Sequence, residues 1–299
     1  GQFDLDVDSN GRWLVEKLLS REVSMNRVPK VVPVLAGVVW ILTLGAAVRA
    51  QDIVALPTRP GVTQSYFLAS LPKNPQAVAV LFPGGAGMLR LREEDGQVRF
   101  SPNNFVVRSR SEFINRGLVA AIVDVPSDLQ TEGMNDDFRL GGNHFTDISA
   151  VVADLGKRLP ALPIFLVGTS RGTISAAALG ARFGSGIAGV VLTSTLFRQT
   201  KPGRGNKQIA PGLSRFDFGA IKVPLLFVHH VNDGCGVTPY ADAARLSGKY
   251  PLISVSGGRP PESGPCDPLS AHGFLGKESE TVEEMVNWML KKPYQQEVK

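Results

Sequence analysis

A serine stands between two glycines in the segment PIFLVGTSRGTISAAALG, which covers residues 163–180. The segment begins as an apolar, β-leaning run and ends in small helix-forming residues, so Gly168-Thr169-Ser170-Arg171-Gly172 falls where a strand turns into a helix. A serine on such a sharp turn exposes its hydroxyl, and glycines two before and two after it let neighbouring backbone approach. The pattern alone would fit an ordinary turn in a glycine-rich chain. Its placement makes Ser170 a candidate nucleophile.

A serine hydroxyl becomes a good nucleophile only when a base removes its proton, so a histidine oriented by a carboxylate is required. The chain has four histidines. Asp233 lies in the loop after the apolar run of VPLLFVHHVNDGCG, and His272 lies in PLSAHGFLG, between the last expected strand and the final helix. Serine, acid and histidine thus follow one another in that order along the chain. We predict Asp233 as the orienting acid and His272 as the base.

The remaining histidines and two other aspartates are the alternatives. His229 and His230 stand at the end of an expected strand, where packing or local hydrogen bonding is the simpler interpretation. His144 precedes an expected helix; it could contact a substrate, although a place beside the helix N-terminus is the simpler interpretation. Asp124 and Asp128 follow a different strand and are the alternative acids.

Acyl transfer also needs backbone N–H donors aimed at the oxygen that becomes negative. Arg171, directly after the serine, is expected to supply one donor. The segment AVLFPGGAGM runs from a strand into four small residues, and we expect the second donor from Gly85 or Ala86. A dinucleotide-binding fingerprint is rejected because Arg90 stands where its third glycine would be.

Short β-rich runs alternate with helical patterns after residue 50, which predicts one α/β domain over residues 51–299. Its sheet is expected to be mostly parallel and doubly wound, with helices on both faces. The expected strands are 65–69, 77–82, 119–125, 164–167, 189–193, 225–229 and 252–256. The expected helices are 104–116, 145–159, 172–183, 239–247 and 279–291. Long connections at 87–102, 126–143 and 196–221 are expected to build the site.

The chain resembles an α/β-hydrolase over essentially all of residues 51–299. The resemblance rests on the serine turn at 168–172, which is called a nucleophile elbow, on the turn at 84–87, and on Asp233 and His272. The connection at 196–221 is too short for a large helical lid, so a small cap or none is expected. The resemblance implies a Ser-His-Asp enzyme, most often an esterase that cleaves carboxylic esters through an acyl-enzyme. Two positions depart from the common pattern. Pro83 replaces the histidine often found before the oxyanion glycines, and Arg171 stands where many esterases have a small or apolar residue.

The same constellation serves a serine peptidase or amidase, which is the first alternative. An esterase that depolymerises polyesters or aryl esters is a variant of the main interpretation, so the expected substrate is a small-molecule or polymeric ester. A non-catalytic binding relative is a further alternative, disfavoured because every triad position is filled. No metal or organic cofactor is expected, since the sequence lacks a Cys/His cluster with zinc spacing.

Residues 25–50 have the pattern of a signal peptide: a basic MNRVPK, an apolar VVPVLAGVVWILTLGAAV and a small-residue site at Val48-Arg49-Ala50. A retained membrane anchor is the alternative, because the apolar run is nearly long enough to span a bilayer. Residues 1–24 are expected to be an upstream extension. We predict export to the periplasm or the medium, with no stable membrane insertion after cleavage.

Export places the two cysteines in an oxidising compartment, which favours a disulfide between Cys235 and Cys266 over two buried thiols. Such a bridge would join the loops that carry Asp233 and His272. The disulfide is therefore expected to hold the acid and the base in place.

Two other classes of function are excluded, one by composition and one by the spacing of a motif. The chain is 43% hydrophobic and 20% charged, and its net charge of +5 is spread without a Lys/Arg block, so a nucleic-acid partner is not expected. The segment DVDSNG, residues 6–11, resembles the start of a calcium loop, but the twelfth position of that loop is Lys17 instead of glutamate. Calcium binding is rejected on that ground.

Overall fold

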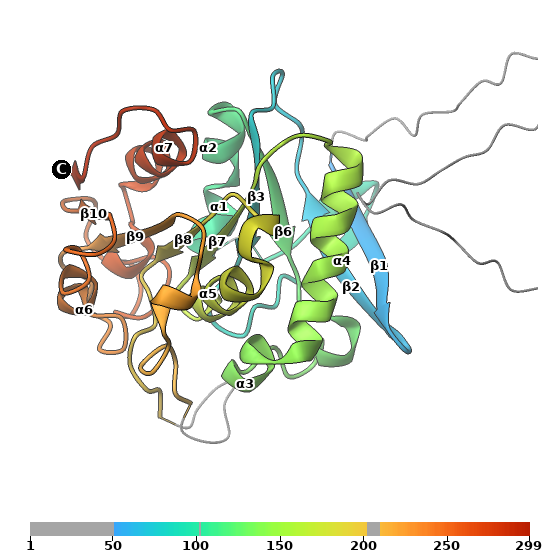
Figure 1. Ribbon diagram of the computed structural model, residues 1–299, viewed down its shortest axis with the longest axis horizontal. Helices are drawn as coiled ribbons and strands as arrows, with labels where there is room; N and C mark the ends of the chain where they lie inside the picture. The colour runs from blue at the N-terminus through green and yellow to red at the C-terminus, as the bar shows by residue number, and fades with distance from the viewer. Residues whose placement is uncertain (1–50, 102, 202–209) are drawn as a thin grey trace, which may run out of the picture. The chain divides into compact units, whose positions relative to one another are not determined.

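The computed structural model describes residues 51–101, 103–201 and 210–299 (Figure 1). The expected upstream extension, signal peptide and calcium-like segment lie outside the described residues. No helix within the described ranges is both long enough and apolar enough to cross a membrane.

A mostly parallel sheet of nine strands forms the centre of the described domain, in the order β1-β2-β6-β3-β7-β8-β9-β10-β11. Strand β2 is antiparallel to both β1 and β6, and the remaining neighbours are parallel. The strands are β1 (Asp52–Arg59), β2 (Val62–Leu68), β3 (Ala77–Phe82), β6 (Leu118–Val123), β7 (Ile164–Thr169), β8 (Gly189–Thr193), β9 (Leu225–His230), β10 (Leu252–Val255) and β11 (Glu297–Val298). A separate antiparallel hairpin pairs β4 (Arg92–Glu94) with β5 (Gln97–Arg99).

Helices cover both faces of the sheet, so the predicted doubly wound α/β class is confirmed (Figure 1). One face packs against α3 (Asp136–Leu140), α4 (Gly142–Arg158), α5 (Gly172–Phe183) and α6 (Tyr240–Ala244). The other face packs against α1 (Phe105–Arg108), α2 (Arg110–Asn115) and α7 (Glu278–Met289). Two apolar cores result, one on each side.

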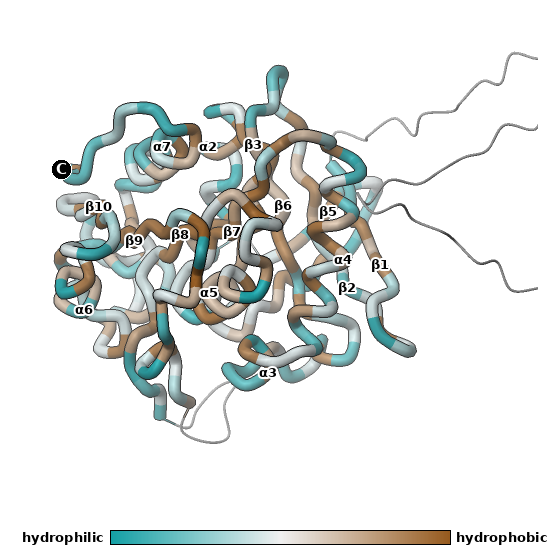
Figure 2. Tube along the Cα trace, in the orientation of Figure 1, coloured by the Kyte–Doolittle hydropathy of each residue, from teal (hydrophilic) through white to brown (hydrophobic). Residues whose placement is uncertain are grey.

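The central strands are mainly apolar because helices bury both of their faces, and their few polar residues lie at their carboxyl ends. Every residue of β3, β6, β7, β8 and β9 is buried, and Figure 2 shows hydrophobic colour along these central strands. The connection at 196–221 was expected to form at most a small cap. Its described residues contain a 3₁₀ turn at Phe218–Ala220 and an isolated bridge between Thr200 and Ala210, in agreement with that expectation.

Arg59 ties the edge strand β1 to helix α4. Its guanidinium donates from Nε and Nη2 to the two carboxylate oxygens of Asp147, at 2.9 and 3.0 Å. Nη1 also donates to Asp128 at 2.9 Å. The side chain of Asp147 is fully buried, and its hydrogen bond with Arg59 raises the pKa of the guanidinium. Asp128, an alternative acid in the sequence analysis, is thus part of this ion-pair cluster.

His144 lies in the core, within the first turn of α4. Its ring is fully buried and contacts the rings of Phe82 and Phe138, with centroids 6.1 and 5.5 Å away. Neither ring nitrogen has a hydrogen-bond partner among the described residues. Burial, assisted by the charges of nearby arginines, lowers the pKa of His144 to about 3. The simpler interpretation, a place beside the helix N-terminus, agrees with this packing.

Replacing Arg59 by methionine is expected to lower the free energy of unfolding by about 3 kcal/mol, because Asp147 stays buried without its cation. Urea denaturation at neutral pH measures the change. The matched control is Arg92→Met, which breaks an ion pair whose two side chains are about half exposed, and it is expected to cost roughly 0.5 kcal/mol. Equal effects of the two substitutions would contradict the role given to Arg59.

Replacing His144 by leucine is expected to flatten the acid dependence of stability. Below pH 6.5 the unfolded chain protonates this histidine, whereas the folded protein keeps it neutral down to about pH 3. The parent therefore loses stability as the pH falls through this window, by up to about 1.4 kcal/mol per pH unit from this one group. Urea denaturation at several values between pH 4 and 7 compares the slopes, and unchanged slopes would refute the prediction.

Candidate active site

Ser170 lies at the turn between β7 and α5, in the left-handed backbone region with φ of 53°. Such a conformation is uncommon for a residue other than glycine and is found at strained functional turns. The flanking glycines make room for the turn. A Cβ at Gly172 would lie 2.1 Å from the carbonyl oxygen of Phe82, and one at Gly168 would lie 2.4 Å from that of Gly172. The backbone thus has the form predicted for a nucleophile elbow.

A cleft of about 240 Å³ opens above this turn. Ser170 and His272 both line it, together with Gly84, Gly85 and Asn104. Three of these residues, Ser170, His272 and Gly85, were predicted site residues from segments far apart in the chain. Asn104, whose buried Oδ1 has no hydrogen-bond partner among the described residues, carried no sequence signal of its own.

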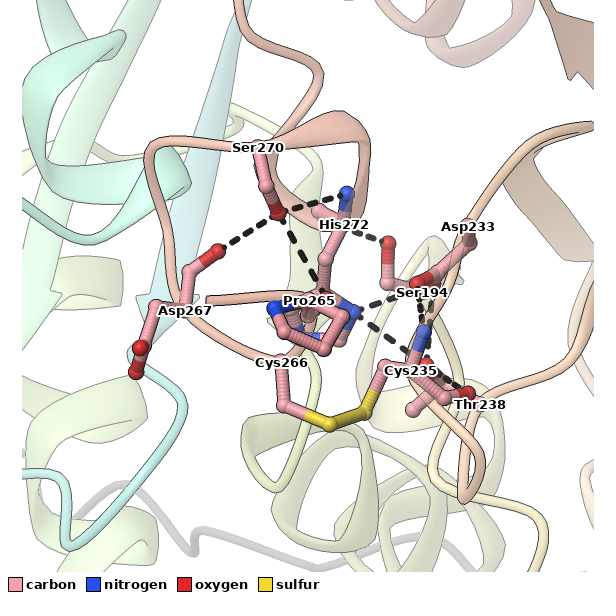
Figure 3. Close-up of a disulfide and its surroundings, with 9 residues drawn as sticks. All are labelled: Ser194, Asp233, Cys235, Thr238, Pro265, Cys266, Asp267, Ser270 and His272. Atoms are coloured by element: carbon pink, nitrogen blue, oxygen red, sulfur yellow. Dashed lines mark hydrogen bonds and ion pairs between the residues drawn. A yellow bond between two sulfur atoms is a disulfide. The ribbon is translucent and has the colours of Figure 1, made fainter. Parts of the chain in front are cut away.

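Asp233 and His272 are joined by a hydrogen bond between Oδ2 and Nδ1, 3.0 Å long (Figure 3). The carboxylate is fully buried, and the imidazole is only 5% exposed. A carboxylate beside Nδ1 accepts a hydrogen bond from the N–H there, which keeps the proton on Nδ1 and leaves Nε2 as the basic nitrogen. That Nε2 is buried and has no hydrogen-bond partner within the described ranges.

Several neighbours hold this pair, and the hydroxyl groups among them were not predicted from the sequence. Thr238 Oγ1 donates to Asp233 Oδ2 at 2.9 Å, while the other carboxylate oxygen accepts the N–H of Cys235 at 2.9 Å. On the histidine side, Ser194 Oγ donates to the backbone carbonyl of His272 at 2.7 Å. Hydroxyls at scattered positions give no recognisable spacing, so sequence reasoning had no signal for them.

The predicted disulfide between Cys235 and Cys266 is present, with Cα atoms 4.6 Å apart (Figure 3). Cys235 stands two residues after the acid, and Cys266 stands six residues before the base. The bridge therefore joins the two loops that carry Asp233 and His272. Cys266 also borders the cleft.

The turn at residues 84–87 packs directly on the serine. A Cβ at Gly84 would lie 2.9 Å from Ser170 Cβ. Gly84 O accepts the N–H of Gly87 at 3.1 Å, and Gly85 has φ of 59°, which a glycine adopts without strain. Gly85 borders the cleft, whereas Ala86, the other candidate donor, accepts at its carbonyl from Met134 N at 2.9 Å.

Arg171 stands at the start of α5, directly after the serine. Its side chain is about one-tenth exposed, and its Nε lies 3.2 Å from Oδ1 of the buried Asp136. The large side chain that departs from the usual pattern therefore has an ion-pair partner inside the protein. The backbone N–H of Arg171 belongs to the first turn of α5, where helix N–H groups have no intrahelical acceptor.

The other candidate acids and bases have different roles. His229 Nε2 accepts the backbone N–H of Thr195 at 2.8 Å, and burial lowers the pKa of His229 to about 3, so its ring is neutral. The Nδ1 of His230 accepts the N–H of Asn232 at 3.1 Å. Asp124 accepts the N–H groups of Leu89 and Leu91, at 2.7 and 3.0 Å, and so orders the connection after β3.

Within the described ranges, no group of three or more His, Cys, Asp or Glu side chains is arranged to hold a metal ion. The chemistry available at the cleft is that of a hydroxyl, an imidazole, a carboxylate and backbone amides. These groups suffice for nucleophilic acyl transfer.

Neither a family model nor any of the curated proteins matches the sequence. Among solved structures, Est1E from Butyrivibrio proteoclasticus has a TM-score of 0.53 at 16% identity, covering 80% of this chain and 98% of its own. XC6422 from Xanthomonas campestris, described as an α/β serine hydrolase without a lid, has a TM-score of 0.51 at 12% identity, covering 79% and 95%.

A cold-adapted esterase from an Arctic intertidal metagenomic library has a TM-score of 0.51 at 13% identity, covering 81% of this chain and 93% of its own. Identities this low speak for the fold alone. The strand order, the turn that carries Ser170 and these matches show that the chain has the α/β-hydrolase fold.

Proposed function

We propose that the protein is a serine hydrolase that cleaves carboxylic esters with Ser170, His272 and Asp233. One observation carries the proposal: Asp233 holds Nδ1 of His272, while Nε2 is left without a partner in the cleft that Ser170 also borders. A buried imidazole oriented in this way is the base that a serine nucleophile needs.

In the proposed reaction, His272 Nε2 takes the proton of Ser170 as Oγ attacks the ester carbonyl carbon. The carbonyl oxygen becomes an oxyanion, which the backbone N–H of Arg171 and that of Gly85 or Ala86 stabilise. His272 then gives its proton to the leaving alcohol, whose bond to the acyl carbon breaks. Water, activated by the same nitrogen, hydrolyses the acyl-enzyme. Throughout, Asp233 keeps the proton on Nδ1 and stabilises the imidazolium.

The structural neighbours favour an ester over an amide. One of them is described as a cold-adapted esterase. Another, Est1E, has been solved with ferulic acid bound. An aromatic acyl group is therefore the first substrate variant to test. A prolyl endopeptidase structure supports the amidase alternative more weakly, because this chain covers only 39% of the length of that protein. Comparing an aminoacyl anilide with the matching ester separates the two.

We also propose that the protein works outside the cytoplasm. The disulfide supports this proposal, since such bridges persist in oxidising compartments. The signal-like segment 25–50 agrees with it.

Ser170→Ala is expected to lower kcat for p-nitrophenyl acetate at least about a thousandfold, because no other group in the proposed mechanism can form the acyl-enzyme. The parent is expected to gain the mass of one fluorophosphonate adduct, and the variant none. Intact-mass spectrometry and a colorimetric assay on oxidised protein measure both.

Ser247→Ala is the control for the serine substitution, since Ser247 is exposed and bonds only within its own turn. It is expected to keep parent activity and labelling. A folded parent that neither hydrolyses the ester nor forms an adduct would refute the proposed function and favour a binding protein.

Replacing both Cys235 and Cys266 by serine is expected to lower the free energy of unfolding by about 3–4 kcal/mol, because the bridge closes a loop of 31 residues. We also expect kcat to fall while KM changes little, since the loops of Asp233 and His272 lose their covalent link. Urea denaturation and steady-state kinetics at a temperature where the variant is folded measure the two effects. Parent values for both would show that the bridge is dispensable to the site.

A further inference from the structure

Arg139, on the short helix α3, is buried beneath the turn at residues 84–87. Only 1% of it is exposed. Nη2 donates to the carbonyl oxygen of Gly85 at 3.2 Å, and Nη1 donates to Ser175 Oγ on α5 at 2.8 Å. The guanidinium therefore links the turn to the helix that begins just after Ser170.

The turn leaves space for this contact. A Cβ at Gly87 would lie 2.8 Å from Nη2 of Arg139, and Gly87 has φ of 77°. Burying a guanidinium is costly unless its N–H groups find acceptors. Burial, with the charge of Arg171, lowers the pKa of Arg139 to about 9, so the group is cationic at neutral pH. Nη1 and Nη2 have acceptors, whereas Nε has none among the described residues, so the cost of burial is only partly offset.

The contact fixes the direction of one peptide in the turn, the one that joins Gly85 to Ala86. In a trans peptide the C=O and N–H bonds point in opposite directions. Gly84 O is held by the N–H of Gly87, which sets the N–H of Gly85; Gly85 O is held by Arg139, which sets the N–H of Ala86. Glycine at position 85 has the freedom to adopt other peptide orientations. Arg139 is the side chain that selects this one.

We propose that Arg139 is a positioning residue that keeps the N–H of Ala86 aimed at the oxyanion formed over Ser170. The inference rests on the proposed function and adds a residue to it. Arginine suits the task because two nitrogens of its rigid planar fork donate separately to Gly85 O and Ser175 Oγ, whereas a lysine has one nitrogen on a flexible stem. Its positive charge also stabilises the negative charge that develops in the transition state.

The test compares Arg139→Met and Arg139→Lys with the parent. With p-nitrophenyl acetate, Arg139→Met is expected to lose about a hundredfold in kcat, with KM within about twofold, as when one oxyanion donor is removed. The kcat of Arg139→Lys is expected to lie between that of Arg139→Met and that of the parent, about tenfold below the parent. A purely structural role would lower stability without this split between kcat and KM.

A second readout reports on the oxyanion directly. The parent and both variants are treated with a trifluoromethyl ketone labelled with ¹³C at its carbonyl, and the shift of the resulting hemiketal is followed with pH. Both variants are expected to raise the pKa of the hemiketal hydroxyl, because its ionised form loses stabilisation. Should Arg139→Met fail to fold, Arg139→Lys decides by the same two readouts.

Arg182→Met is the matched control. Arg182 also donates to backbone carbonyls, those of Leu140 at 2.8 Å and Gly141 at 3.1 Å, but these lie at the C-terminal end of α3 and not in the 84–87 turn. The kcat of the Arg182→Met variant is expected to be within about threefold of that of the parent. An active parent with folded Arg139 variants of parent-like kcat and hemiketal pKa would overturn the inference alone. A parent without turnover or a fluorophosphonate adduct would overturn the proposed function, and this role with it.

Discussion

The close approach of three backbone segments around Ser170 is the constraint on which the site depends. The carbonyl of Phe82 at the end of β3 leaves no room for a Cβ at Gly172, and the carbonyl of Gly172 leaves none at Gly168. A Cβ at Gly84 would collide with Ser170 itself. Because no side chains intervene, β3, β7 and α5 meet within contact distance. The serine, the first turn of α5 and the 84–87 turn are thereby brought to one point.

The proposed acid and base lie outside the sheet. Asp233 is in the loop after β9, and His272 is in a 3₁₀ turn at Ala271–Gly273. Asp233 is held by the backbone of Cys235 and by Thr238, and the backbone of His272 is held by Ser194. The disulfide then links the two loops covalently. Proton transfer tolerates little displacement, so several restraints on one hydrogen bond are what such chemistry requires.

Sequence reasoning succeeded where one strong pattern decided the structure. The bounds of β3, β8 and α5 were predicted without error, because buried apolar runs and an elbow followed by small residues are unambiguous. It missed β1, which contains Pro57 at the sheet edge, and α3, which is too short for a helical period. Arg139, which lies on α3, was also missed. Its partners are a carbonyl 54 residues away and a hydroxyl 36 residues away, and neither contact has a sequence pattern.

Charged groups lie near both parts of the site. Arg139 contacts the 84–87 turn, and Arg171 stands at the N-terminus of α5 with Asp136 as its buried counterion. Asp233 is buried against His272. In the proposed reaction a proton moves to the imidazole as negative charge moves to the carbonyl oxygen. The carboxylate thus lies beside the group that becomes positive, and the cations lie near the group that becomes negative. Since these charges are buried and already oriented, little reorganisation accompanies the transfer.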